Sequence, residues 1–272
     1  MTDFAIDGST AKVNAPAAKT FMLALTGGTF IGIGMLFFLT SQIGAAAMPL
    51  GMAKVVGGLV FTVGLALVVL TGAELFTGST LALGARTVGR VSWGQVLRNW
   101  AIVYVGNFFG ALTLAGLIWL GGSWESGKGA LGLGALKAAD AKCSHTIVEA
   151  IALGILCNLL VCLAVWLTYA GRTATDKIIA LTLPIAMFVA CGFEHSVANM
   201  FLLPFAMMLK TWAPASFWAE TATSADAFSH LSWTGIFTSN ILPVTVGNII
   251  GGGIMIGVFY TIVHKKIGAA KP

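Results

Sequence analysis

Six long apolar stretches alternate with short polar segments along the chain. Four of them are close to the ~20 residues that an α-helix needs to cross a bilayer. The other two, at 31 and 32 residues, are longer than one crossing requires. The pattern predicts an all-α integral membrane protein with six transmembrane helices. In chain order the stretches are Phe21–Thr40, Val55–Ala85, Val96–Leu120, Ile147–Ala170, Ile178–Leu209 and Ile236–Val263.

Polar residues interrupt each of the two longest stretches in its C-terminal half. The sequence is T-G-A-E-L-F-T-G-S over residues 71–79 and C-G-F-E-H-S-V-A-N over residues 191–199. An ionisable side chain at the bilayer centre costs about 2.5–3.5 kcal/mol on insertion scales and usually faces a bundle interior or a pore. We therefore predict that spans 2 and 5 are each broken into two half-helices around a polar turn. The alternative is a polar pair that only seals a helix interface.

The two halves of the chain share an internal repeat. Gly72-Ala-Glu74 corresponds to Gly192-Phe-Glu194, and G-N-x-x-G at 106–110 corresponds to G-N-x-x-G at 247–251. Each half holds three predicted spans, so the repeats, at about 20–121 and about 145–265, must be inverted (3+3). Inverted repeats with broken helices at matching positions indicate a transport site near the midplane. His195 breaks the symmetry, because Leu75 occupies its place in the first half.

Composition and charge exclude several classes of protein. Apolar residues make up 57% of the chain and charged residues 9%, and the length leaves no room for a separate enzyme module. The net charge of +5 is scattered between spans, which gives no support for nucleic-acid binding. The four cysteines show no C-x-x-C, and the four histidines fall on different segments. We therefore expect no metal site, no haem and no other cofactor.

The basic residues predict the orientation. Ten of the 15 lie on the side that holds both termini, which the positive-inside rule places in the cytoplasm. The N-terminal arm, 1–19, and the tail, 266–272, are then cytoplasmic, and 20–265 forms a multi-pass transport domain in the bacterial inner membrane. Gly121–Ser144 and Thr211–Gly235 become extracytoplasmic loops. The ten residues are Lys12, Lys19, Arg86, Arg90, Arg98, Arg172, Lys177, Lys265, Lys266 and Lys271.

The combined motifs resemble the formate/nitrite transporter family. The resemblance rests on G-F-E-H-S-V-A-N-M at 192–200, A-E-L-F-T at 73–77 and P-V-T-V-G-N-I-I-G at 243–251, and covers about Lys19–Lys265. It implies a homopentamer of six-span subunits, each with its own pore and an aquaporin-like inverted repeat. It also implies a channel for formate and similar small monovalent anions in the lipid bilayer.

The resemblance further implies residue roles, with no catalytic residue among them. His195 matches the central pore histidine, with Thr77 and Asn248 as its hydrogen-bonding partners. The alternative, without the resemblance, is a structural role for each residue. The apolar side chains listed below would then be ordinary packing, Thr77 and Asn248 would be helix caps, and Glu74 would be structural. Glu149 is expected near the interface or paired. The implied constriction residues are Phe61, Leu65, Leu75, Phe76 and Phe188, and the implied supporting network is Glu194, Lys142 and Asn158.

Several functions and two mechanisms remain open from the sequence. Nitrite or hydrosulfide could replace formate as the substrate, and a water or glycerol pore is disfavoured by the lack of an Asn-Pro-Ala pair. A membrane anchor for a formate-oxidising enzyme would need haem-ligating histidine pairs. In one mechanism His195 lends a charge or a hydrogen bond to the anion. In the other it protonates formate, which then crosses as a neutral acid.

Overall fold

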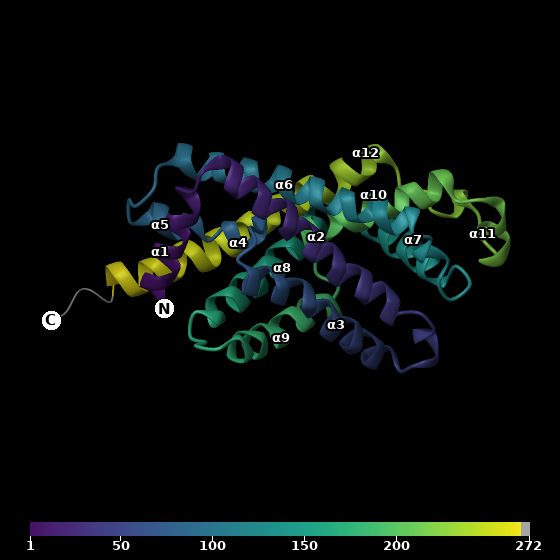
Figure 1. The fold of residues 1–272 in the computed structure, drawn as a ribbon, viewed down its shortest axis with the longest axis horizontal. Coiled ribbons are helices and arrows are strands. Elements are labelled where there is room, and N and C mark those ends of the chain that lie inside the picture. The colour runs from purple at the N-terminus through teal and green to yellow at the C-terminus, as the bar shows by residue number, and fades with distance from the viewer. Residues whose placement is uncertain (268–272) are drawn as a thin grey trace.

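The computed structural model describes residues 1–267, and every regular element in this part of the chain is helical (Figure 1). The last apolar stretch is one rod, Trp233–Lys265, in which π-helical turns join three short α-helices. The α-helices are α1 (Thr2–Val13), α2 (Ala17–Ser41), α3 (Leu50–Thr71), α4 (Phe76–Ser79), α5 (Ala82–Thr87), α6 (Trp93–Leu120), α7 (Ala130–Cys143), α8 (Ile147–Thr168), α9 (Ala174–Ala190), α10 (Ser196–Trp212), α11 (Ala215–Glu220), α12 (Trp233–Gly235), α13 (Leu242–Asn248) and α14 (Phe259–Thr261).

Five continuous helices among the described residues are long and apolar enough to cross a membrane. They are α2, α3, α6, α8 and the rod Trp233–Lys265, so the prediction of an all-α, multi-pass membrane protein is confirmed. The predicted fifth span is divided between α9 and α10, each 17 residues long. Of the predicted tail 266–272, residues 268–272 lie outside the described part of the chain.

The long helices pack in pairs whose backbones touch. α2 lies along α6, α8 lies along α13, and α3 lies beside α9. Glycines permit this closeness. A Cβ added at Gly28 would collide with the carbonyl oxygen of Asn107, and one added at Gly247 would collide with that of Ile151. Small residues at such crossings let helices in a membrane approach closely. The close approach supplies van der Waals contact, because the hydrophobic effect does not drive helices together in lipid.

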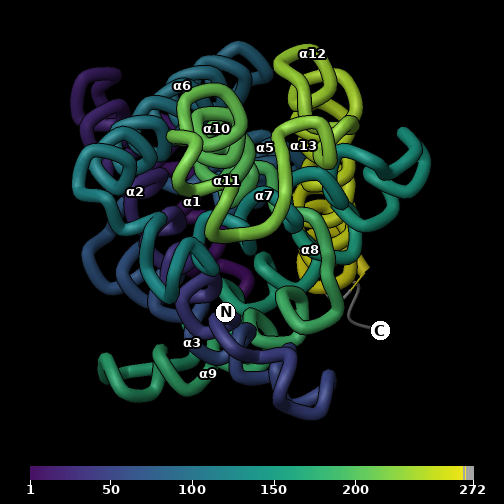
Figure 2. Tube along the Cα trace, turned by 90° about the vertical axis from the view of Figure 1, so that its right-hand side faces the viewer, coloured from purple at the N-terminus to yellow at the C-terminus, as the bar shows by residue number. Residues whose placement is uncertain are grey.

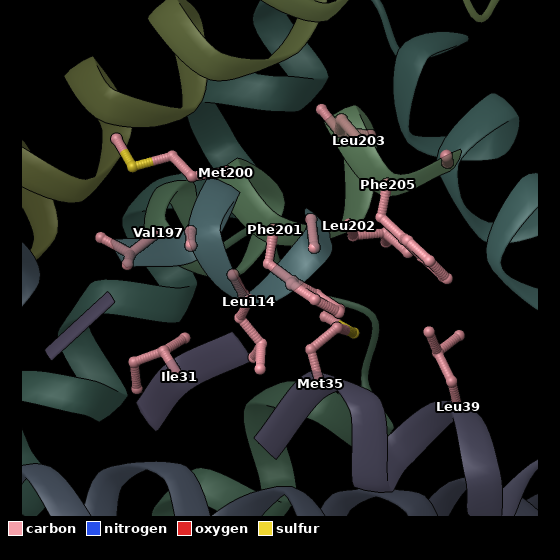
Figure 3. Close-up of a cluster of buried hydrophobic side chains, with 14 of the residues drawn as sticks. Ile31, Met35, Leu39, Leu114, Val197, Met200, Phe201, Leu202, Leu203 and Phe205 are labelled. Carbon is pink, nitrogen blue, oxygen red and sulfur yellow. The ribbon is translucent and has the colours of Figure 1, made fainter. Parts of the chain in front are cut away.

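The half-helix α10 forms the centre of the bundle. In the end-on view it lies between α2 and α6 on one side and α13 on the other (Figure 2). The first three turns of α10, from Ser196 to Ala206, are buried on every side, including Met200, Phe201 and Phe205. Figure 3 shows Phe201 close to Met35 of α2 and to Leu114 of α6. This part of α10 therefore lies inside the bundle rather than against lipid.

The N-terminal arm is an ordered helix docked on the bundle. Ala5, Ile6 and Val13 of α1 are buried, and α1 packs against α5 and α6. An ion pair between Asp3 and Lys265 ties α1 to the end of the last rod. The hydrogen bond from Lys265 lowers the pKa of Asp3, so the pair stays charged at neutral pH. Both ends of the described chain therefore lie at the same end of the molecule (Figure 1).

The segment Gly121–Ser144, predicted as a loop, contains the helix α7. Its buried residues Leu131, Ala135, Leu136, Ala139 and Cys143 recur at helical spacing and face α10. The sequence pattern is weak because small alanines and glycines supply most of this face. Lys137, Asp140 and Lys142 also make the segment look polar. The helix ends at Cys143, and Thr146 caps the start of α8 with Glu149 in a reciprocal capping box. Glu149 is thus paired, as expected.

Candidate functional site

Two breaks in the helices meet inside the bundle, and both are built in the same way. α3 ends at Thr71 and is followed directly by Gly72, whereas α9 ends at Ala190 and is followed by Cys191 and then Gly192. Both glycines have a φ of 74°. Left-handed backbone of this kind favours glycine, which has no Cβ to clash. Leu75 and His195 then lie in extended backbone immediately before α4 and α10. The breaks fall within the two interruptions predicted from the sequence.

Two buried asparagines satisfy the backbone at these breaks. Asn107 Oδ1 accepts from the backbone N–H of Phe76 at 2.9 Å, and its Nδ2 donates to the carbonyls of Ala24 and Glu74 at 2.7 and 2.8 Å. Asn248 repeats this arrangement. Its Oδ1 accepts from the Ser196 N–H at 3.0 Å, and its Nδ2 donates to the carbonyls of Gly154 and Glu194 at 2.8 and 2.9 Å.

Asn248 was predicted to be a hydrogen-bonding partner of His195, and the structure gives it a different contact. Its side chain bonds the backbone on both sides of the histidine rather than the imidazole ring. The capping alternative therefore describes its contacts. Asn107, which was not among the predicted site residues, does the same for the first break.

His195 is held through both ring nitrogens. Nδ1 accepts a hydrogen bond from the backbone N–H of Ala198 at 3.1 Å, and Nε2 lies 3.1 Å from Thr77 Oγ1. A backbone N–H can only donate, so Nδ1 is unprotonated and the neutral ring carries its proton on Nε2. His195 therefore caps α10 with one nitrogen and points an N–H at Thr77 with the other. Phe188 stacks on the ring, with centroids 5.8 Å apart.

A charged network lies beside His195. Lys142 Nζ is 2.5 Å from Glu194 Oε1, and the Nδ2 atoms of Asn199 and Asn240 lie 2.6 and 3.1 Å from Glu194 Oε2. Lys142 and Glu194 were predicted to share a network, and the structure brings them together. Asn199 is the last residue of the interruption at 191–199. Asn240 lies seven residues before the G-N-x-x-G motif of its half, as Asn99 does in the first half, and this spacing is the sequence feature that could have identified it.

Asn158 belongs to a different set of contacts from the one predicted. Its Nδ2 donates to the carbonyls of Thr77 and Asn248 at 3.1 and 2.6 Å, and to Thr80 Oγ1 at 3.1 Å. It joins the first break to the last rod rather than bonding Lys142 or Glu194. Its amide therefore positions Thr77, the hydroxyl that faces His195.

Two cavities flank the breaks. The α1-side cavity, of about 170 Å³, is lined by residues that include Lys12, Leu65, Leu75 and Ser79. The His195 cavity, of about 110 Å³, is lined by residues that include Phe61, Phe188, Lys142 and His195 itself. Four of the five predicted constriction residues therefore border a cavity, Leu65 and Leu75 on one side and Phe61 and Phe188 on the other. Phe61 and Phe188 meet edge to face, with centroids 5.5 Å apart.

Phe76 does not fit its predicted place among the constriction residues. It is buried, and its ring packs edge-on against Trp100 and Tyr104 of α6, with centroids 6.0 and 4.8 Å apart. It borders neither the α1-side cavity nor the His195 cavity. Successive side chains point in different directions at the start of α4. With Leu75 facing the α1-side cavity, Phe76 packs toward α6.

A second carboxylate–ammonium pair lies at the other break. Lys12 Nζ of α1 is 3.3 Å from Glu74 Oε2, and Glu74 is 4% exposed. Glu74 repeats Glu194 in the sequence, so its location beside a break was expected. The pairing of Glu74 with Lys12 of the N-terminal arm was not expected, because nothing in the sequence of residues 1–19 indicates where the arm docks. Asn99 Nδ2 also reaches the carbonyl of Lys12, at 3.4 Å.

The fold and site define a multi-pass membrane protein in which a buried histidine at one helix break borders a cavity and a second cavity lies beside the other break. The model of the family described as Formate/nitrite transporter matches residues 1–262, and the chain belongs to this family. The match includes the arm and so begins earlier than the expected start near Lys19.

Relatives and solved structures agree with this assignment. The chain is 46% identical to the formate channel FocA of Escherichia coli (strain K12), over 98% of this chain and 93% of that protein. It is 43% identical to FocA of Haemophilus influenzae, over 97% and 93%. A solved structure titled "Pentameric formate channel with formate bound" superposes with a TM-score of 0.87 at 45% identity, over 92% of this chain and 98% of that one. An FNT family ion channel gives 0.80 at 25% identity, over 100% and 98%.

Proposed function

We propose that the protein is a channel for formate and similar small monovalent anions, assembled as a homopentamer. The similarity to a pentameric channel solved with formate bound carries this proposal, because it extends over nearly the whole of both chains. The geometry supports it. The His195 ring borders the His195 cavity, and its Nε2 lies 3.1 Å from the hydroxyl of Thr77. A site of this size suits a small anion that accepts two hydrogen bonds.

We further propose that the subunit crosses the membrane six times in two inverted repeats. Two observations support this arrangement. Asn107 and Asn248 make matching bonds at the two breaks, and the N–H groups of Glu74 and Glu194 donate to Leu23 and Leu153 at matching places, at 3.1 and 3.3 Å. In this arrangement α9 and α10 together make one crossing, as α3 and α4 do in the first half.

The orientation is also a proposal. The excess of Lys and Arg at the end that holds α1 and the last rod places both termini in the cytoplasm of a bacterial inner membrane. In that orientation the α1-side cavity opens to the cytoplasm and α7 lies on the outer face. Reporter fusions near Gly129 and after Lys265 should give opposite signals, and equal signals would contradict both the orientation and the six crossings.

The two apolar constrictions set the mechanism. Moving a carboxylate out of water without compensation is very costly, so Leu65 with Leu75 and Phe61 with Phe188 oppose a hydrated anion. Between them, His195 offers an N–H from Nε2, and the hydroxyl of Thr77 can donate in turn. Protonating His195 at Nδ1 would break its bond with the Ala198 N–H. These contacts support the mechanism in which a neutral histidine donates a hydrogen bond, and they make protonation of formate a step that must first protonate the ring.

Light scattering from proteoliposomes tests the proposed function. Liposomes with purified protein should admit formate far faster than empty liposomes, nitrite and hydrosulfide less fast, and chloride and glycerol hardly at all. Glycerol entry at the formate rate would indicate a neutral-solute pore instead. Formate entry no faster than in empty liposomes would contradict the proposal.

The same assay tests the two aromatic positions. Phe188→Ala should let chloride through, because Phe188 borders the His195 cavity and its loss widens the constriction. Phe76→Ala should leave selectivity unchanged and lower stability by about 3–5 kcal/mol, since Phe76 packs between Trp100 and Tyr104. Wild-type selectivity in stable Phe188→Ala protein would remove Phe188 from the constriction.

A further inference from the structure

A second histidine lies against the charged network of the His195 cavity. His145, in the turn between α7 and α8, places Nε2 3.8 Å from Glu194 Oε1. Lys142 Nζ approaches the same oxygen at 2.5 Å. Glu194 is almost completely buried, whereas the His145 side chain is 30% exposed. His145 thus reaches from solvent to a carboxylate that bears directly on a cavity-lining ammonium.

The charges around His145 come from three elements. Lys142 belongs to α7, Glu194 to the break before α10, and Glu149 to the first turn of α8, where it is occupied by the capping bonds of Thr146. Asp140, one turn before Cys143 on α7, is taken by the backbone N–H of His230, at 2.9 Å, and by the His230 ring. Among these described groups, Glu194 is therefore the carboxylate for which His145 and Lys142 compete.

We propose that His145 is a proton-sensitive positioning residue that controls how far the Lys142 ammonium is available to anions in the His195 cavity. The inference rests on the proposed function, in which this cavity is an entrance for anions. Lys142 lines the cavity, so a change in its pairing changes the charge that an entering anion meets.

The direction of the effect follows from simple electrostatics. When His145 is neutral, Glu194 Oε1 has one close cation, and Lys142 is held on it. When His145 is protonated, two cations share one oxygen and repel each other, so Lys142 is released toward the cavity. Imidazole titrates between about pH 5 and 8, so acidification of the α7 side should strengthen anion binding from that side.

The test measures formate half-saturation from each face of the protein at pH 5.5 and 7.5. His145→Gln should match wild type at pH 7.5 and require severalfold more formate at pH 5.5. His145→Lys should match wild type at pH 5.5 and require severalfold less formate at pH 7.5. His230→Gln is the matched control, since His230 is on the same face but bonds Asp140, and it should follow wild type at both pH values. Each variant is compared with wild type at the same pH, so the effects of pH on formate and on His195 cancel.

The two faces separate this role from a structural one. The His145 variants should change half-saturation only for entry from the α7 face, whereas a structural defect would change entry from both faces. Equal values for His145→Gln and wild type at pH 5.5, or equal shifts on both faces, would overturn the inference while leaving the proposed function intact.

Discussion

Replacing His195 with asparagine is expected to leave an assembled protein that conducts formate but loses the part of the pH response, between about pH 5 and 8, that depends on the His195 ring. Asparagine is a good N-cap, so its side-chain oxygen can take over the bond from the Ala198 N–H that His195 now accepts. It also offers an N–H toward Thr77. It cannot titrate, so any pH response or proton coupling that depends on the ring is lost.

His195→Phe is the contrasting variant, and formate flux should fall to the rate of empty liposomes. Phenylalanine has about the shape of the ring that stacks on Phe188, but it offers no N–H to an anion. It also loses the cap, at a cost of about 0.5–2 kcal/mol, which should still permit assembly. Formate flux and vesicle pH, recorded together for wild type and both variants, measure the pH response and the proton coupling. A wild-type pH profile in His195→Asn would show that the ring's titration has no role.

Asn248→Leu and Asn107→Leu are expected to destabilise the protein strongly and to a similar extent. Each substitution leaves one backbone N–H and two carbonyls without their partner at a break inside the bundle. An unsatisfied buried group costs about 1–3 kcal/mol, so the loss should be about 3 kcal/mol or more. Similar losses are expected because the two asparagines make matching bonds at the two breaks.

Thermal unfolding of the purified protein measures this effect. Asn14→Leu is the matched control, because Asn14 is exposed and its side chain accepts one hydrogen bond, from Gln95. It should unfold within a few degrees of wild type. If Asn107→Leu were as stable as Asn14→Leu while Asn248→Leu unfolded early, the equivalence of the two breaks would be wrong.

The sequence was sufficient to place the breaks but not all the residues around them. Gly72 with Glu74, and Gly192 with Glu194, are close in sequence, and their backbone conformation follows from local rules that glycine spacing reveals. The pairing of Lys142 with Glu194 was inferred through family resemblance. Residue spacing alone does not show that α7 folds back over α10.

Phe76 and Asn158 differ from their predicted places for the same physical reason. The direction in which Phe76 points depends on the space left by Trp100 and Tyr104, and the partners of Asn158 depend on how α8 meets the last rod. Both are properties of tertiary packing. The docking of α1 is a similar case. Ala5, Ile6 and Val13 form only a small apolar face, and the surface that covers it comes from α5 and α6.

The central claim is that formate crosses within each subunit, between the α1-side cavity and the His195 cavity. Formate flux through Leu65→Trp tests it most directly, because Leu65 is 2% exposed, borders the α1-side cavity and belongs to the proposed constriction. Leu59→Trp is the matched control, with the same substitution on the same helix at a position that is 41% exposed. Overpacking at Leu65 costs about 1–3 kcal/mol, so assembly is checked by size-exclusion chromatography. The account predicts flux at the empty-liposome rate for assembled Leu65→Trp and at the wild-type rate for Leu59→Trp. Wild-type formate flux through assembled Leu65→Trp would place the path elsewhere in the oligomer and contradict the account.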